Sequence, residues 1–143
     1  MIDLGEQNAR LMEGSTEMDY KIIVLDLDGT LTNRDKIITP RTREALMKIQ
    51  DMGKIVVLAS GRPTHGVMPL ARELELERHG GYILSFNGGM IVNCQTGETV
   101  FSSQLPAEIN KKVIGLAQEH RVDIMTYEGD KIIASNAAYQ YIA

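Results

Sequence analysis

The sequence predicts an α/β fold, a doubly wound parallel sheet of which three strands are present. Apolar runs rich in β-branched residues, at 21–25, 54–59 and 82–86, are typical of strands buried on both faces. Two segments of helical periodicity separate them, as in parallel sheets. Each run ends in a polar tip that contains glycine, at 26–30, 60–62 and 87–89. Because ligands bind beyond the carboxyl ends of such strands, the three tips predict one shared site.

The two helices between the strands have recognisable ends. Thr39 can cap the first helix, and Pro40 suits its first turn because no N–H is needed there. Gly53 is expected to end that helix in the left-handed conformation. The second helix is expected to begin at Pro63 and to break at Gly80. Its apolar stripe consists of Val67, Leu70, Ala71 and Leu74.

After the third strand the pattern becomes antiparallel. Two hairpins are expected, one from 90–93 and 98–101 and one from 122–127 and 131–134. A helix that begins at Leu105 separates them, with an apolar stripe at Ile109, Val113, Leu116 and Ala117. We therefore expect three parts. They are a flexible extension over 1–19, a partial core over 20–103, and the incomplete start of an α+β domain over 104–143.

Composition excludes several classes of partner. The chain has 143 residues, a net charge of −4 and no run of Lys or Arg, which argues against nucleic-acid and membrane-surface partners. Cys94 is the one cysteine, so no internal disulfide can form. The apolar runs are too short to span a bilayer, and the chain does not open with a signal peptide. These features predict a cytoplasmic location.

The first tip carries two acids with a spacing suited to phosphoryl chemistry. Asp26, at the end of a buried strand, can attack phosphorus and form an aspartyl-phosphate. Asp28 lies on the same side of an extended chain, so it can protonate the leaving oxygen and later activate water. Two acids this close need a cation, which implies Mg²⁺. An ordinary acidic loop is the weaker interpretation, because Asp-Leu-Asp-Gly-Thr follows a β-branched run.

The other tips leave alternatives open. Arg62 can reach the substrate, pair with an acid, or serve only the start of its helix. Asn87 can bind substrate, orient the first tip, or mark an Asn-Gly turn.

Residues 20–31 resemble the first signature of the haloacid dehalogenase superfamily. Together with 39–46, 59–62 and 85–89, they make the chain similar to Cof-type phosphatases over 20–134. Those enzymes carry a large α/β cap inserted after the third strand, and many dephosphorylate sugar phosphates and related metabolites. The resemblance therefore implies a Mg²⁺-dependent phosphomonoester hydrolase that acts on small-molecule phosphate esters.

The resemblance also implies roles for individual residues. Asp26 would be the nucleophile and a metal ligand, and Asp28 would be the acid/base and a further metal ligand through its backbone carbonyl. Ser60 and the amide of Gly61 match the second signature, which holds the phosphoryl oxygens. This fits the need of phosphoryl transfer for fixed donors. A simple turn residue is the alternative for Ser60.

Two further signatures of the family, a lysine and an acidic Gly-Asp-x-x-x-Asp, are not found in the chain. In Cof-type enzymes both follow the cap, so we expect these 143 residues to be truncated before them and inactive alone. A non-catalytic remnant or binding module that keeps the first half of the fold is the alternative. A phospho-receiver domain is disfavoured, because Asn87 rather than an acid follows the third strand. The missing neighbour would leave 21–25 as an open apolar edge, so we expect the isolated chain to self-associate, to misfold, or to require its missing half supplied in trans.

Overall fold

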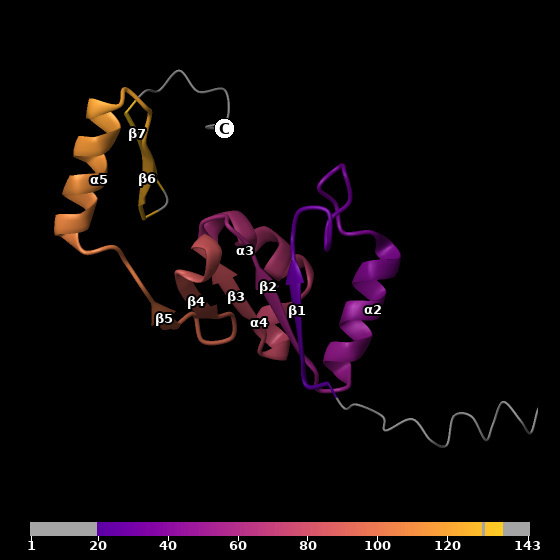
Figure 1. Ribbon diagram of the computed structural model, residues 1–143. Coiled ribbons are helices and arrows are strands. Elements are labelled where there is room, and N and C mark those ends of the chain that lie inside the picture. Colours follow the sequence, from indigo (N-terminus) through magenta and orange to yellow (C-terminus); the bar gives the residue numbers. More distant parts are fainter. Residues whose placement is uncertain (1–19, 130, 136–143) are drawn as a thin grey trace, which may run out of the picture.

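The computed structural model describes residues 20–129 and 131–135, so the extension predicted over 1–19 lies outside them. The described residues form a five-stranded sheet and a separate two-stranded sheet (Figure 1). Strands β1 (Ile22–Asp26), β2 (Ile55–Ala59) and β3 (Tyr82–Ser85) are parallel and adjacent. In their register Asp26 pairs with Ala59, and Ala59 pairs with Leu84. The α/β fold is confirmed, and the three strand ends lie at one level.

The first predicted hairpin belongs to the same sheet. Strand β4 (Met90–Asn93) pairs antiparallel with β3, and β5 (Thr99–Ser102) pairs antiparallel with β4. The sheet is therefore mixed, with three parallel strands followed by two antiparallel ones. The chain reverses after β3 in the short 3-10 segment η1 (Phe86–Gly88), where Phe86 and Asn87 have φ of 53° and 55°. This turn brings β4 back along β3.

Helix α2 (Pro40–Asp51) begins as predicted. The Thr39 hydroxyl accepts a hydrogen bond from the Thr42 amide at 3.2 Å. Gly53 follows the helix with φ of 78°, the left-handed conformation expected from the sequence. Both ends of α2 are thus set by local residue chemistry.

The second predicted helix is interrupted earlier than expected. Helix α3 (Thr64–Glu73) ends before Glu75, which has φ of 53°, and the separate helix α4 (Leu76–His79) follows. The end predicted at Gly80 is confirmed, but the interruption at Glu75 was not predicted. Gly80 ends α4 with φ of 76°, and Gly81 lets β3 start close to β2, because a Cβ there would lie 2.7 Å from the Val56 carbonyl oxygen.

The core lies between the sheet and these helices. Val56 and Leu58 of β2 are buried, and they belong to one cluster with side chains of α2 and α3. The two helices contribute Leu46, Val67 and Ala71 to this cluster, and Leu74, directly after α3, belongs to it as well. The side-chain amide of Gln50 (Nε2) donates a hydrogen bond to the Leu74 carbonyl at 3.0 Å, and this bond links α2 to the end of α3. The predicted apolar stripe is therefore buried at Val67, Ala71 and Leu74, and Leu70 is partly buried against the same cluster.

Strand β1 is an edge of the described sheet. Ile22 and Val24 are 54% and 57% exposed, although both are β-branched apolar residues. Ile23 and Leu25, which alternate with them, are partly covered. The open apolar edge expected from the sequence is present in the part of the chain that the structure describes.

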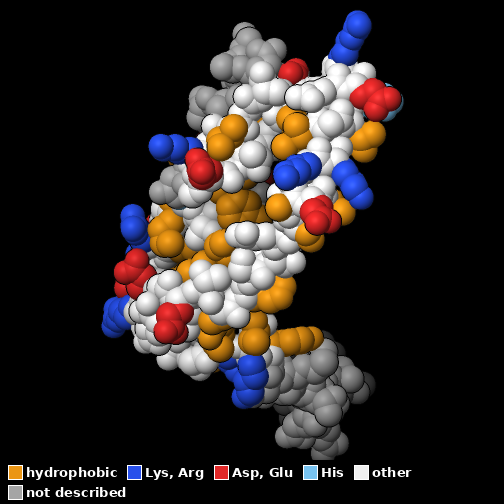
Figure 2. Space-filling view, turned by 90° about the vertical axis from the view of Figure 1, so that its left-hand side faces the viewer, with side chains coloured by type: hydrophobic (Ala, Val, Ile, Leu, Met, Phe, Trp, Pro, Cys, Tyr) orange, Lys and Arg blue, Asp and Glu red, His pale blue; other side chains and the backbone are white. Residues whose placement is uncertain are grey.

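The remaining elements are helix α5 (Ala107–Glu119) and strands β6 (Met125–Glu128) and β7 (Lys131–Ala134), which pair antiparallel. The hairpin is shorter than predicted, since β6 begins at Met125. The stripe of α5 is largely uncovered by described residues, with Ala117 buried and the others exposed. Figure 2 shows this side of the molecule, where hydrophobic side chains gather among scattered charges. No helix within 20–129 and 131–135 is long and apolar enough to cross a bilayer.

Candidate active site at the strand ends

The first tip is built around a buried leucine between two exposed acids. Asp26 ends β1 and is exposed, Leu27 is fully buried, and Asp28 is exposed again. The Leu27 carbonyl accepts hydrogen bonds from both the amide and the hydroxyl of Thr32, each at 2.9 Å. Gly29, with φ of 86°, allows the sharp turn between them. The loop thus fixes the backbone that carries both acids.

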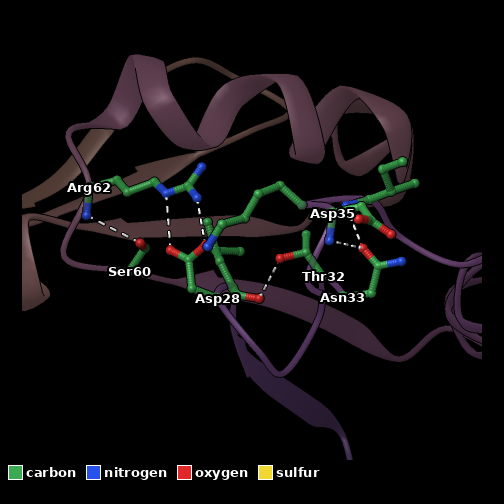
Figure 3. Close-up of polar contacts among 9 residues, drawn as sticks. Asp28, Thr32, Asn33, Asp35, Ser60 and Arg62 are labelled. Carbon is green, nitrogen blue, oxygen red and sulfur yellow. Dashed lines mark hydrogen bonds and ion pairs between the residues drawn. The ribbon is translucent and has the colours of Figure 1, made fainter. Parts of the chain in front are cut away.

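Asp28 is held by two cations (Figure 3). Arg62 binds its carboxylate as a fork, with Nη2 at 2.6 Å from Oδ1 and Nε at 3.2 Å from Oδ2. Lys36 Nζ lies 2.7 Å from the same Oδ1. The Lys36 hydrogen bond lowers the pKa of Asp28 below its ordinary value, Arg62 adds to this, and burial opposes it. Asp28 is therefore ionised in the free site, and Arg62 pairs with an acid.

The sequence did not indicate Lys36 as a site residue. It lies eight positions after Asp28, in a turn where its φ is 62° and its amide donates to the Asn33 carbonyl at 3.0 Å. Asn33 Oδ1 accepts from the amides of Asp35 and Ile37 and closes this turn (Figure 3). Asn33 in a polar loop is a sequence signal for a turn. This signal could have predicted that the loop folds back toward Asp28.

The second and third tips are joined by hydrogen bonds. Ser60 Oγ accepts from the Arg62 amide at 3.1 Å, and the Ser60 carbonyl accepts from the Asn87 amide at 3.1 Å. The Phe86 amide donates to the Arg62 carbonyl at 3.0 Å. A Cβ on Gly61 would lie 2.9 Å from Asn87 Oδ1, so only glycine fits there without a shift. Asn87 therefore contacts the second tip and lies in the Asn-Gly turn after β3, with φ of 55° followed by 87° at Gly88. Its contacts with a substrate and with the first tip stay predictions.

Hydrogen bonds thus link Asp28, Ser60, Arg62 and Asn87 at the carboxyl ends of the strands. Asp26 is the last residue of β1 and precedes Asp28 by two positions. The haloacid dehalogenase-like hydrolase family profile matches residues 23–142. The chain belongs to this family. The Cof-type resemblance noted in the sequence is confirmed.

Several relatives match most of the length of this chain. A haloacid dehalogenase-like hydrolase from Bacteroides thetaiotaomicron is 47% identical, with a TM-score of 0.78 over 86% of this chain and 46% of that one. YxeH of Bacillus subtilis is 31% identical over 82% of this chain and 43% of its own. YwtE of the same organism, a 5-amino-6-(5-phospho-D-ribitylamino)uracil phosphatase, is 30% identical over 80% of this chain and 38% of its own. The chain spans less than half the length of these relatives.

Phosphatases of the haloacid dehalogenase family typically use Mg²⁺. Asp26 and Asp28 offer the hard oxygen donors that Mg²⁺ prefers. Among the residues that the structure describes, no group of three or more His, Cys, Asp or Glu side chains could hold a metal ion. The two acids therefore fit a magnesium site in donor type, and their role as ligands stays a prediction.

Cys94 is not a candidate nucleophile in this chain. It is buried, and burial, with a smaller contribution from the charge of Glu77, raises the pKa of its thiol to about 11. The thiolate is the reactive form, so this cysteine stays inert at neutral pH.

An aromatic contact joins the third tip to the second hairpin. The rings of Phe86 in η1 and Tyr127 in β6 meet edge to face, with centroids 5.4 Å apart and planes at 67°. Phe86 is the residue whose amide binds the Arg62 carbonyl. The position of the β6–β7 hairpin is thereby linked to the loop that carries Ser60 and Arg62.

Removal of either ring should loosen this link. We expect a double-mutant cycle of Phe86→Ala and Tyr127→Ala, measured as free energy of unfolding in urea, to give a coupling of about 0.5–1.5 kcal/mol. Amides of β6 should also exchange faster in both single variants. Phe101→Ala provides the control, because Phe101 is an exposed ring on β5, and its coupling to Tyr127 should be near zero. Equal coupling for both phenylalanines would contradict the link.

Proposed function

We propose that these residues form part of a Mg²⁺-dependent phosphomonoester hydrolase that acts on small phosphorylated metabolites such as sugar phosphates. The observation that carries the proposal is that hydrogen bonds link Asp28, Arg62 and Ser60 at the strand ends, next to the end of β1 at Asp26. This arrangement provides a nucleophile, an acid/base and phosphate donors at one edge of the sheet. That YwtE is a phosphatase of a phosphorylated ribityl compound supports the class of substrate.

The proposed reaction has two steps. Asp28, which is ionised in the free site, first takes a proton from solvent as the substrate binds. An Asp26 carboxylate oxygen then attacks phosphorus, the bond from phosphorus to the leaving oxygen breaks, and Asp28 gives that oxygen its proton. Asp28 then takes a proton from water, the water oxygen attacks the aspartyl-phosphate, and inorganic phosphate and Asp26 are released. Ser60 Oγ and the Gly61 amide hold the phosphoryl oxygens throughout. When bound, Mg²⁺ would neutralise charge on those oxygens and on Asp26.

The second hairpin is part of the same proposal. We infer that residues 104–143 begin a cap over the site, as in the Cof-type resemblance, and that 20–103 belong to the core. The Phe86–Tyr127 contact supports this division, because it places β6 beside the third tip. A cytoplasmic location also stays a prediction.

A non-catalytic binding module is the second candidate. It is favoured by the incomplete set of metal ligands among the described residues. Phosphate binding without turnover would support it. The two candidates therefore differ in a measurable way.

A fusion tests the proposal directly. It joins residues 1–143 to the part of the Bacteroides thetaiotaomicron hydrolase that the chain does not match. With Mg²⁺ we expect this fusion to hydrolyse sugar phosphates and nucleotides and to leave phosphopeptides intact, because a cap over the site excludes bulky esters. The release of inorganic phosphate measures all three. Preferential turnover of phosphopeptides would overturn the substrate class, and phosphate binding without any turnover would favour the binding module.

A further inference from the structure

We propose that Lys36 is a phosphate-binding residue whose ammonium group exchanges the Asp28 carboxylate for the phosphoryl group of the substrate. The inference rests on the proposed function and deepens it. It assigns a cation to the phosphate site from the loop after the first tip.

The first step of the argument is that Lys36 is surplus to the pairing of Asp28. The Arg62 fork already binds both oxygens of the carboxylate, Oδ1 at 2.6 Å and Oδ2 at 3.2 Å. Lys36 Nζ adds a second cation at 2.7 Å from Oδ1. If Lys36 moves away, Asp28 remains paired, so the departure of Lys36 does not leave an isolated charge. The exchange therefore costs the protein one charge-assisted hydrogen bond and leaves Asp28 paired with Arg62.

The second step is that Lys36, rather than Arg62, is the cation able to move. The Arg62 backbone is held at both ends, its amide by Ser60 Oγ and its carbonyl by the Phe86 amide. The Lys36 side chain is 62% exposed, against 36% for Arg62, and it ends in a compact ammonium on a flexible stem. Its backbone is fixed by the turn at Asn33. The backbone of Lys36 is thus fixed, while its ammonium group is free to move.

The third step concerns the position of the Lys36 ammonium group. Ser60 Oγ is hydrogen-bonded to the amide of Arg62, and the guanidinium of Arg62 shares Asp28 Oδ1 with Lys36 Nζ (Figure 3). A phosphoryl group held by Ser60 between Asp26 and Arg62 would therefore lie beside the ammonium. An ammonium has three donors, and Asp28 uses one of them.

The fourth step is electrostatic. Asp26 and Asp28 carry two negative charges, and Lys36 and Arg62 carry two positive ones, so these four side chains are balanced before substrate binds. A phosphomonoester dianion attracts a cation more strongly than a single carboxylate does. Its arrival therefore draws Lys36 from Asp28 and leaves Oδ1 bound by one cation, Arg62, instead of two. Binding of phosphate and the loss of one cation from the acid/base would be coupled through one side chain.

The test measures binding of inorganic phosphate to the 143-residue chain by calorimetry, with Mg²⁺ and again with EDTA. We expect Lys36→Met to raise the dissociation constant on the order of tenfold, because a charge-assisted hydrogen bond is lost. Lys36→Arg should largely restore binding. Arg34→Met is the matched control, since it removes one positive charge from the same exposed loop. It should change the constant less than about twofold, because exposed charges are well screened.

Three results would overturn the inference. Equal weakening by Lys36→Met and Arg34→Met would show only a general effect of charge. Phosphate binding that Ser60→Ala abolishes and Lys36→Met leaves intact would remove Lys36 and keep the proposed function. A wild-type chain that binds no phosphate would also remove Lys36, whereas turnover by the fusion tests the proposed function separately. Unfolding midpoints of the variants show whether each remains folded.

Discussion

Asp26→Asn is expected to abolish the phosphoenzyme and to lower turnover by the fusion on the order of 10⁴- to 10⁶-fold, as for the loss of other covalent nucleophiles. An amide oxygen is a far weaker nucleophile than a carboxylate. The substitution keeps the shape of the side chain, and Asp26 is exposed at the end of β1, so the fold should not change. Mass spectrometry of the acid-quenched fusion should find phosphate on Asp26 in the wild type and on no residue in the variant.

Two further variants separate the roles of neighbouring acids. Asp28→Asn should slow both departure of the leaving group and hydrolysis of the intermediate, so label on Asp26 should still be trapped. Asp35→Asn is the matched control, because Asp35 is an exposed acid in the same loop, and its turnover should stay within about twofold. Phosphate label on any residue other than Asp26 would refute the assignment.

The parts of the site that could be predicted from the sequence depend on local order. Buried strands, their polar tips and the ends of α2 follow from residues adjacent in the chain, such as Thr39 and Gly53. Parallel pairing then puts the ends of β1, β2 and β3 at one edge. Asp26, Asp28, Ser60 and Arg62 were named on this basis, and the structure places the last three in contact through hydrogen bonds.

The parts of the fold and of the site that the sequence did not predict depend on backbone conformations that the residue types do not indicate. Lys36 and Glu75 adopt positive φ, which is uncommon for residues with a Cβ, so neither the return of Lys36 nor the break before α4 was expected. The sequence also did not predict which strand the first hairpin would pair with. Residues 90–93 can pair with any free strand edge, and the reversal at Phe86 and Asn87 decides that β4 joins β3. Such choices are set by the packing of the whole sheet.

The open edge of β1 leads to the second large expected effect, which is self-association of the 143-residue chain. In the parallel ladder the Ile55 amide donates to the Lys21 carbonyl at 2.9 Å, and successive residues of β1 turn their peptide groups alternately toward β2 and away from it. Those turned away form an edge that can pair with another chain. Ile22 and Val24 add exposed apolar surface beside it.

Charge placed on this edge should suppress the association. We expect wild-type chain to show a weight-average mass of a dimer or larger in light scattering at micromolar concentration, and Ile22→Lys with Val24→Lys to be mainly monomeric, because like charges repel at a strand pair. Ile37→Lys is the matched control. Ile37 is 57% exposed, as Val24 is, but it lies in the loop before α2, so this variant should associate like the wild type. Hydrogen exchange should report slower exchange at the edge amides as concentration rises. A monodisperse wild-type monomer with strongly protected amides from Ile22 to Leu25 would show that the edge is covered within a single chain, and the expected association would then be wrong.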